Sequence, residues 1–172
     1  SSMDKLAKLN PVFEKPYGKV TPGNSSPLSD GASAALIMSE QRAEALGLRP
    51  RARFHTFAIA GSDPEIMLTG PIPATHKALQ RSGLSIDDFD AYEVNEAFAS
   101  VPLAWAKEFN ADPQKLNPRG GAIALGHPLG GSGMRLMATM LNYLEATDGR
   151  YGLQAMCEGG GLANVTIIER LR

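Results

Sequence analysis

The sequence has little of what marks a disulfide-bonded, zinc-binding or membrane-embedded protein. Its single cysteine, Cys157, excludes an internal disulfide and a cysteine-based zinc cluster. No apolar run approaches the length needed to cross a bilayer. The formal net charge of −1 provides no electrostatic attraction to nucleic acid or to an anionic membrane. We therefore expect a cytoplasmic protein without a metal site, a nucleic-acid partner or a membrane span.

Glycine, in contrast, is concentrated in one stretch. Six of the 18 glycines lie between residues 120 and 133, around His127 and Pro128. So many glycines cost backbone entropy on folding. They are found where two backbone segments approach closely or where a residue adopts a positive φ. Apolar residues at helical spacing begin directly afterwards. The stretch predicts either a packing corner with an incidental histidine or a catalytic imidazole held on a rigid turn before a helix.

The rest of the chain alternates between strand and helix patterns. We expect strands over 51–60, 89–94, 151–157 and 163–169, and helices over 39–46, 71–82, 98–109 and 131–147. Three glycines between the last two strands indicate a hairpin. Residues 1–23 are interrupted by proline and glycine, and 32–38 favours a buried strand or a helix–strand transition. The pattern predicts an α/β fold with a mixed β-sheet covered by helices.

Three polar residues stand at the ends of predicted elements. Asn95, His127 and Cys157 are each about thirty residues apart, the length of one strand–helix step, so they can meet at one sheet edge. Cysteine and histidine both exchange protons near neutral pH. Cys157 is therefore either the nucleophile of a Cys–His pair or a small buried apolar residue. Asn95 either orients a water or donates a hydrogen bond to an oxyanion, or it is a turn or cap residue.

Three motifs occur here in the order and spacing of one enzyme family. They are Asn95-Glu96-Ala97-Phe98, the glycine stretch with Gly126-His127-Pro128, and Cys157-Glu158-Gly159-Gly160-Gly161. Together they resemble the C-terminal half of thiolases, the acetyl-CoA C-acyltransferases. Residues 21–31 and 63–75 also look like that family. By this resemblance, 1–47 is the end of the loop region with the last part of the N-terminal half, and 48–172 is the C-terminal domain.

The resemblance implies a ping-pong acyl transfer that uses coenzyme A. A nucleophilic cysteine takes the acyl group as a thioester. The acyl group then passes to CoA or, in the reverse Claisen condensation, to the α-carbon of an acetyl group. His127 would activate the nucleophile and point at an oxyanion. Cys157 would be the acid/base that shuttles the proton, not the nucleophile. Asn95 would position a water in that oxyanion hole, and the N–H of Gly159 would serve a second one.

The resemblance also implies the ligands and partners. Ser26 looks like the serine that contacts the CoA pantetheine, and Phe98 like a wall of the acyl pocket. CoA and acyl-CoA would be substrates, with no covalently bound cofactor. The family's nucleophile lies in an N-terminal half that this chain lacks, so we expect the chain alone to be inactive. The intact protein would be a homodimer or homotetramer, mitochondrial or peroxisomal if eukaryotic.

Two alternatives remain open at this stage. A 3-ketoacyl synthase relative would share the fold and the condensation chemistry, but such proteins typically carry other polar residues at the place of Cys157. A module that binds CoA or assembles with a partner without catalysis is the second alternative. Mass spectrometry of the purified protein, which shows whether an N-terminal partner chain is present, is the observation that would best decide among these alternatives.

Overall fold

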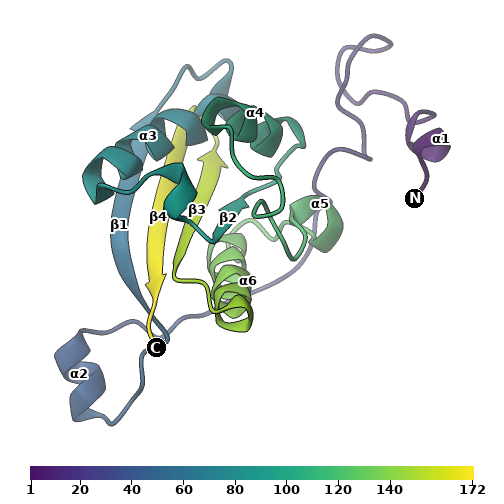
Figure 1. Ribbon diagram of the computed structural model, residues 1–172. Helices are drawn as coiled ribbons and strands as arrows, with labels where there is room; N and C mark the ends of the chain where they lie inside the picture. The colour runs from purple at the N-terminus through teal and green to yellow at the C-terminus, as the bar shows by residue number, and fades with distance from the viewer.

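The computed structural model describes residues 1–172 and contains one four-stranded sheet in the order β1-β4-β3-β2 (Figure 1). The strands are β1 (Ala52–Gly61), β2 (Ala91–Val94), β3 (Tyr151–Glu158) and β4 (Leu162–Arg170). β4 pairs with β1 and with β3 in antiparallel fashion, whereas β2 pairs with β3 in parallel. The mixed sheet expected from the sequence is therefore present, and Asn95 directly follows the edge strand.

Helices cover both faces of this sheet (Figure 1). On one face α3 (Pro71–Ser82) and α4 (Ser100–Phe109) complete an apolar core that includes the fully buried Trp105. On the other face α6 (Ser132–Thr147) packs Met140 and Leu144 against β2 and β4. The smaller elements are α1 (Met3–Leu6), α2 (Glu40–Ala45), α5 (Ala122–Leu125) and the 3₁₀ turns Met67–Thr69 and Ile86–Asp88. No helix is long and apolar enough to cross a bilayer.

Local signals at the helix ends explain why most predicted bounds agree with the structure. The Ser39 side chain accepts a hydrogen bond from the Arg42 N–H and begins α2. Pro71 opens α3, and Gly83 ends it in the left-handed conformation. Pro102 lies in the first turn of α4, where its missing N–H does no harm.

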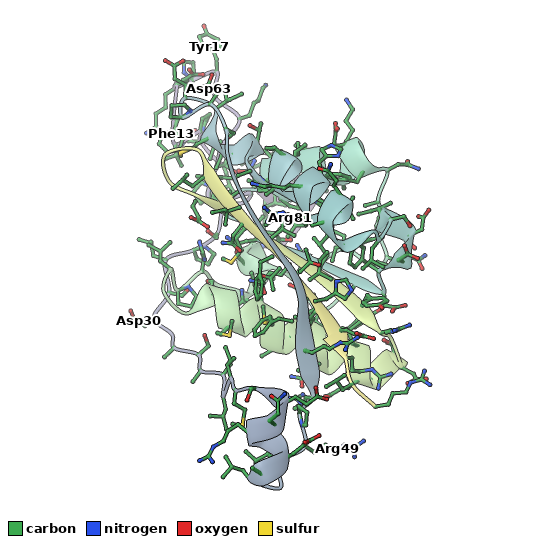
Figure 2. The ribbon with its side chains drawn as sticks, turned by 90° about the vertical axis from the view of Figure 1, so that its left-hand side faces the viewer. Phe13, Tyr17, Asp30, Arg49, Asp63 and Arg81 are labelled. Carbon is green, nitrogen blue, oxygen red and sulfur yellow. The ribbon has the colours of Figure 1, made fainter.

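The prediction of a buried strand or helix–strand transition over 32–38 is wrong. These residues form no regular element, and Leu36 and Ile37 are 80% and 61% exposed. An apolar run forms a strand only where a neighbouring strand satisfies its backbone groups, and the two edges of this sheet are β1 and β2. The N-terminal segment instead runs along the outside of the domain, with Phe13 and Tyr17 towards one end of the view and Arg49 towards the other (Figure 2). Residues 1–23, expected to be irregular, contain the single-turn α1.

A buried carboxylate joins three parts of the chain at the end of β4. Glu169 is 6% exposed and accepts hydrogen bonds from the Nε atoms of Arg53 (2.6 Å) and Arg150 (2.8 Å). Burial alone would raise the pKa of Glu169, but the hydrogen bonds from the two arginines outweigh it and leave this pKa lowered. The ionised carboxylate therefore connects β1 and β4 to the turn that enters β3.

We expect Glu169→Gln to lower the free energy of unfolding by about 1–3 kcal/mol, because two charge-assisted hydrogen bonds are weakened. Since the folded pKa of Glu169 is lowered, the wild type has this stabilisation at neutral pH and loses it as the pH falls through that pKa. Urea unfolding at several pH values measures both effects. Glu145→Gln, which disrupts the exposed ion pair with Arg51, is the matched control and should cost less than about 1 kcal/mol. Equal losses for the two variants would contradict the assignment.

Candidate active site

The glycine stretch forms a tight corner that places His127 between two helices. α5 ends at Gly126, whose φ of 94° is one that residues with a side chain rarely adopt. A Cβ atom at Gly126 would also overlap the Ser29 hydroxyl. His127 and Pro128 follow, and the chain enters α6 at Ser132. The corner therefore requires glycine both for its conformation and for close packing against the N-terminal segment.

Hydrogen bonds on both sides of the His127 ring define its tautomer. Ser132 Oγ lies 2.6 Å from Nδ1, and the Ser132 hydroxyl donates to the Pro128 carbonyl at 3.0 Å. Because the single hydroxyl proton of Ser132 points to the Pro128 carbonyl, Ser132 Oγ accepts a hydrogen bond from the Nδ1–H of His127. The unprotonated ring nitrogen, which carries the free lone pair, is therefore Nε2. Asn95 Nδ2 lies 3.4 Å from Nε2 and donates to it. Burial, and then the charge of Arg135, lower the pKa of His127, so the ring is neutral at pH 7 and can accept a proton at Nε2.

Asn95 is held in place by the residue that follows it. Its backbone N–H donates to the Ala155 carbonyl at 2.9 Å, which continues the pairing of β2 with β3. The Glu96 carboxylate accepts from the Ile123 N–H at 3.0 Å and from Asn117 Nδ2 at 3.2 Å. These bonds join the end of β2 to α5 and thereby to the histidine corner.

Asn117 continues the sheet beyond its edge strand. Its side-chain amide accepts from the Val94 N–H at 2.9 Å and donates to the Val94 carbonyl at 3.0 Å, as a neighbouring strand would. Its backbone N–H donates to the Tyr92 carbonyl at 2.8 Å. The unpaired side of β2 is therefore satisfied, and the strand end that carries Asn95 is fixed on both sides.

Cys157 lies near the carboxyl end of β3, beside the strand that Asn95 follows. Its side chain packs against the apolar core on the α3 side and forms no hydrogen bond with His127 or Asn95. Burial is the main cause that raises the pKa of the Cys157 thiol, with a smaller contribution from the charge of Glu158. The structure thus joins Asn95 and His127 directly and places Cys157 at the same sheet edge without a contact.

Gly159 begins the turn between β3 and β4. Its N–H has no backbone acceptor in the chain, and the space beside its Cα is open. The donor is therefore free to meet a ligand from outside the chain.

Ser26 and Phe98 lie in two segments that pair with each other. The Ser26 N–H and hydroxyl both lie within hydrogen-bond distance of the Ala97 carbonyl, at 3.1 and 3.2 Å, and Ser25 forms a bridge with Phe98. The neighbouring Pro27 carbonyl accepts from the His127 N–H at 3.2 Å. The predicted CoA-contacting segment therefore adjoins both the Asn95 and the His127 loops.

An open pocket of about 320 Å³ lies beside the imidazole. It is lined by Leu28, Ser29, Asp30, His127 and Leu129. Figure 2 shows Asp30 at the outer edge of the molecule, so this pocket opens to the surface beside the N-terminal segment. The pocket reaches His127 but includes neither Asn95 nor Cys157.

Sequence reasoning missed Ser132, Glu96 and Asn117 as residues that build the site. Ser132 and Glu96 lie within motifs that were recognised, five residues after His127 and one after Asn95. Asn117 carries a weaker signal, a turn-forming asparagine before Pro118. Glu96 and Asn117 contact residues more than twenty positions away, and the contact of Ser132 with His127 depends on how the corner folds, so periodicity contains no information about these contacts.

Comparisons with known proteins give one consistent result. Residues 48–170 match the family described as thiolase, C-terminal domain, and residues 1–41 match thiolase, N-terminal domain. The chain is 60% identical over 171 residues to the steroid 3-ketoacyl-CoA thiolase FadA6 of Mycobacterium tuberculosis, covering 99% of this chain and 42% of that protein. It is 56% identical over 168 residues to a 3-ketoacyl-CoA thiolase of Vibrio cholerae, with 96% and 43% covered.

The fold leads to the same family. The solved structure of human mitochondrial 3-ketoacyl-CoA thiolase in complex with CoA matches with a TM-score of 0.96 and 44% identity, covering 100% of this chain and 43% of that one. The chain thus spans about two fifths of the length of the relatives that it matches. Because one family description matches most of its length and the sheet and helices superpose on a solved member, the chain belongs to the thiolase family.

Proposed function

We propose that this chain carries the acid–base part of a 3-ketoacyl-CoA thiolase, which cleaves a 3-ketoacyl-CoA with CoA or runs the reverse Claisen condensation. The observation that carries the proposal is the neutral His127 ring, which presents an unprotonated Nε2 beside the Asn95 amide in an open pocket. Curated relatives with 60% and 56% identity are named 3-ketoacyl-CoA thiolases, which supports the same reaction.

In this proposal His127 Nε2 takes the proton from a nucleophilic thiol. The thiolate attacks the 3-keto carbon, and the bond between C2 and C3 breaks with its electron pair left on C2. Cys157 gives its proton to that carbon and so releases acetyl-CoA. The Cys157 thiolate then takes the proton of an incoming CoA thiol, whose sulfur attacks the acyl thioester and frees the nucleophile. The raised pKa of Cys157 suits a group that starts this sequence protonated.

Two sets of donors would stabilise the oxyanions of these steps. Asn95 has one amide proton directed at His127 and one left for a bound water. When protonated, His127 Nε2 itself becomes a donor toward an oxyanion. The unpaired N–H of Gly159 supports a second oxyanion hole at the acyl thioester.

The CoA moiety would lie against the segment that contains Ser26, with Phe98 as a wall of the acyl pocket. The contact of this segment with the His127 loop supports that placement, because a thioester beside the imidazole must continue into its pantetheine arm. A related thiolase has been solved with CoA bound. No covalently bound cofactor is needed for this chemistry.

The nucleophilic cysteine of this proposal comes from the N-terminal half of the family. The only cysteine here, Cys157, is already assigned. The exposed apolar residues Leu36 and Ile37 favour packing against that half. We further propose that the intact enzyme is a homodimer or homotetramer and acts in the cytoplasm, or in mitochondria or peroxisomes in a eukaryote.

The isolated chain should not cleave acetoacetyl-CoA in the presence of CoA, because it has no cysteine for the acyl-enzyme. Adding an N-terminal thiolase half that carries the nucleophilic cysteine should restore turnover, whereas the same half with that cysteine changed to alanine should not. Turnover by the chain alone would refute the role given to Cys157. Failure of both mixtures, despite a stable complex by sedimentation, would favour an assembly module without catalysis.

Substitutions at the two acid–base groups should differ in how strongly they slow each half-reaction of the intact enzyme. His127→Asn removes both the base and an oxyanion donor, and should slow acylation and deacylation by roughly 10²–10⁴-fold. Cys157→Ser raises the pKa of the shuttle far above neutral, so it should block condensation while acyl-enzyme formation is partly retained. Rapid-quench measurement of the acyl-enzyme separates the steps. Equal loss of both steps in Cys157→Ser would argue against a shuttle.

Ser132 is a positioning residue in this proposal, since it acts only through His127. Ser132→Ala should lower kcat/KM by roughly ten- to a hundred-fold, the range known for groups that orient a functional histidine. ¹⁵N NMR of the ring should show an unprotonated Nε2 in the wild type and a mixture of tautomers in the alanine variant. Ser132→Thr keeps the hydroxyl and should restore the wild-type tautomer. An unchanged tautomer in Ser132→Ala would refute the positioning role.

A further inference from the structure

Buried polar atoms without a partner are confined to one part of the molecule. Six buried side-chain nitrogen and oxygen atoms form no hydrogen bond within the chain, and all belong to Glu93, Asn95, Arg135 and Gln154. Glu93, Asn95 and Gln154 are each at most 3% exposed. A buried polar atom left without a partner opposes folding, and more strongly when it is charged. Such a concentration indicates a shared ligand.

The backbone places these four residues on one face of the sheet. Glu93 aligns with Gln154 in the parallel pairing of β2 and β3, so the two side chains are neighbours. Glu93 lies between Ala91, which packs on α6, and Asn95, which contacts His127. Arg135 is in the first turn of α6, where Nη2 donates a long hydrogen bond of 3.4 Å to the Gly126 carbonyl. The cluster therefore lies between the sheet and α6, beneath the histidine corner.

The positive charge of Arg135 acts on both Glu93 and His127. Burial raises the pKa of Glu93 to about 8, and the positive charge of Arg135 opposes this rise while Glu96 adds to it. The same arginine contributes to the lowered pKa of His127. Arg135 therefore lies within electrostatic range of both Glu93 and His127, although it forms no ion pair with the carboxylate.

The chemistry of the unpaired atoms defines what fits among them. Four are acceptors, namely both oxygens of Glu93, Oδ1 of Asn95 and Oε1 of Gln154, whereas Nε and Nη1 of Arg135 are donors. A metal ion would be repelled by the Arg135 guanidinium, an anion could not donate to the acceptor oxygens of Asn95 and Gln154, and an apolar group would satisfy none of these atoms. Water both donates and accepts, and buried waters commonly make about three hydrogen bonds.

We propose that Glu93, Arg135 and Gln154 enclose a buried water-binding site that holds the Asn95 amide with Oδ1 inward and its NH₂ toward His127. Ordered water bridges the Arg135 donors to Oδ1 and to the Glu93 carboxyl group. The amide cannot then rotate and present its oxygen to Nε2, where two acceptors would oppose each other. The catalytic meaning of this site rests on the proposed function, whereas the presence of the water does not.

A crystal structure of the wild-type protein at a resolution that orders internal water tests the site directly. We expect at least one water within hydrogen-bond distance of both Arg135 and Glu93 or Asn95. A dry cluster, with Arg135 bonded directly to Glu93 and Asn95, would overturn the proposal. A metal ion or a solvent anion in that place would overturn it as well.

Variants test the link to the amide. Arg135→Met removes the donors, so Asn95 Oδ1 should lose its partner and the amide should rotate, which shifts the ¹⁵N resonance of His127 Nε2. The resonance is compared at a pH at which the ring is neutral in both proteins, so that the lost charge of Arg135, which contributes to the lowered pKa of His127, does not change its protonation. Glu93→Leu should expel the water and produce a shift in the same resonance. Glu169→Gln changes the other buried glutamate of this sheet, which is paired with arginines, and should leave the His127 resonance unchanged.

Only three histidines are present, so the resonance can be assigned by comparison with His127→Asn. An unshifted His127 signal in a folded Arg135→Met protein would overturn the link. If Arg135→Met does not fold, the wild-type crystal structure still decides whether the water is bound. Water found together with an inactive enzyme would refute the proposed function alone, whereas a dry cluster in an active enzyme would refute only this inference.

Discussion

The Glu96 carboxylate is the interaction on which the site depends. Its two oxygens accept one hydrogen bond from α5 and one from Asn117, which itself pairs with β2. A single side chain thus aligns the strand end that carries Asn95 with the corner that carries His127. Its position also explains Gly121, because a Cβ atom there would overlap the carboxylate. This connection adds to the direct Asn95–His127 contact and to the bonds that the Ser26 segment makes with both loops.

The two faces of the sheet serve different purposes. The α3 and α4 face is an apolar core in which Trp105 forms one polar contact, a hydrogen bond to Thr75 at 2.8 Å. The α6 face has a smaller apolar cluster, and its end nearest His127 is occupied by the unpaired polar residues around Glu93. Burying such groups opposes folding, whereas the larger core on the opposite face favours it. The larger apolar core and the unpaired polar residues thus lie on opposite faces of one four-stranded sheet.

Short-range signals predicted most of the fold, and the exceptions have physical causes. Caps, prolines and glycines define α2 and α3 locally. The meeting of Asn95 with His127 was predicted from their spacing at element ends, although His127 lies between two helices and only Asn95 follows a strand. The strand expected over 32–38 needed a partner that composition does not reveal. Ser132 could not be assigned as the orienting group because its contact depends on how a corner folds. Glu93 was hidden in an apolar strand pattern, where its alignment with Gln154 requires the sheet pairing.

The turn after Cys157 shows that three identical residues can be glycine for different reasons. Gly160 and Gly161 have φ of 77° and 82°, and a Cβ at Gly161 would collide with the Ser62 carbonyl, so the backbone itself selects glycine there. Gly159 has no positive φ, and its Cβ would meet open space. Any small residue satisfies the conformation at that position. If the Gly159 N–H serves as the oxyanion donor proposed above, a side chain at 159 would stand beside that donor, so access for a ligand, and not the backbone conformation, would be the reason for glycine at this position.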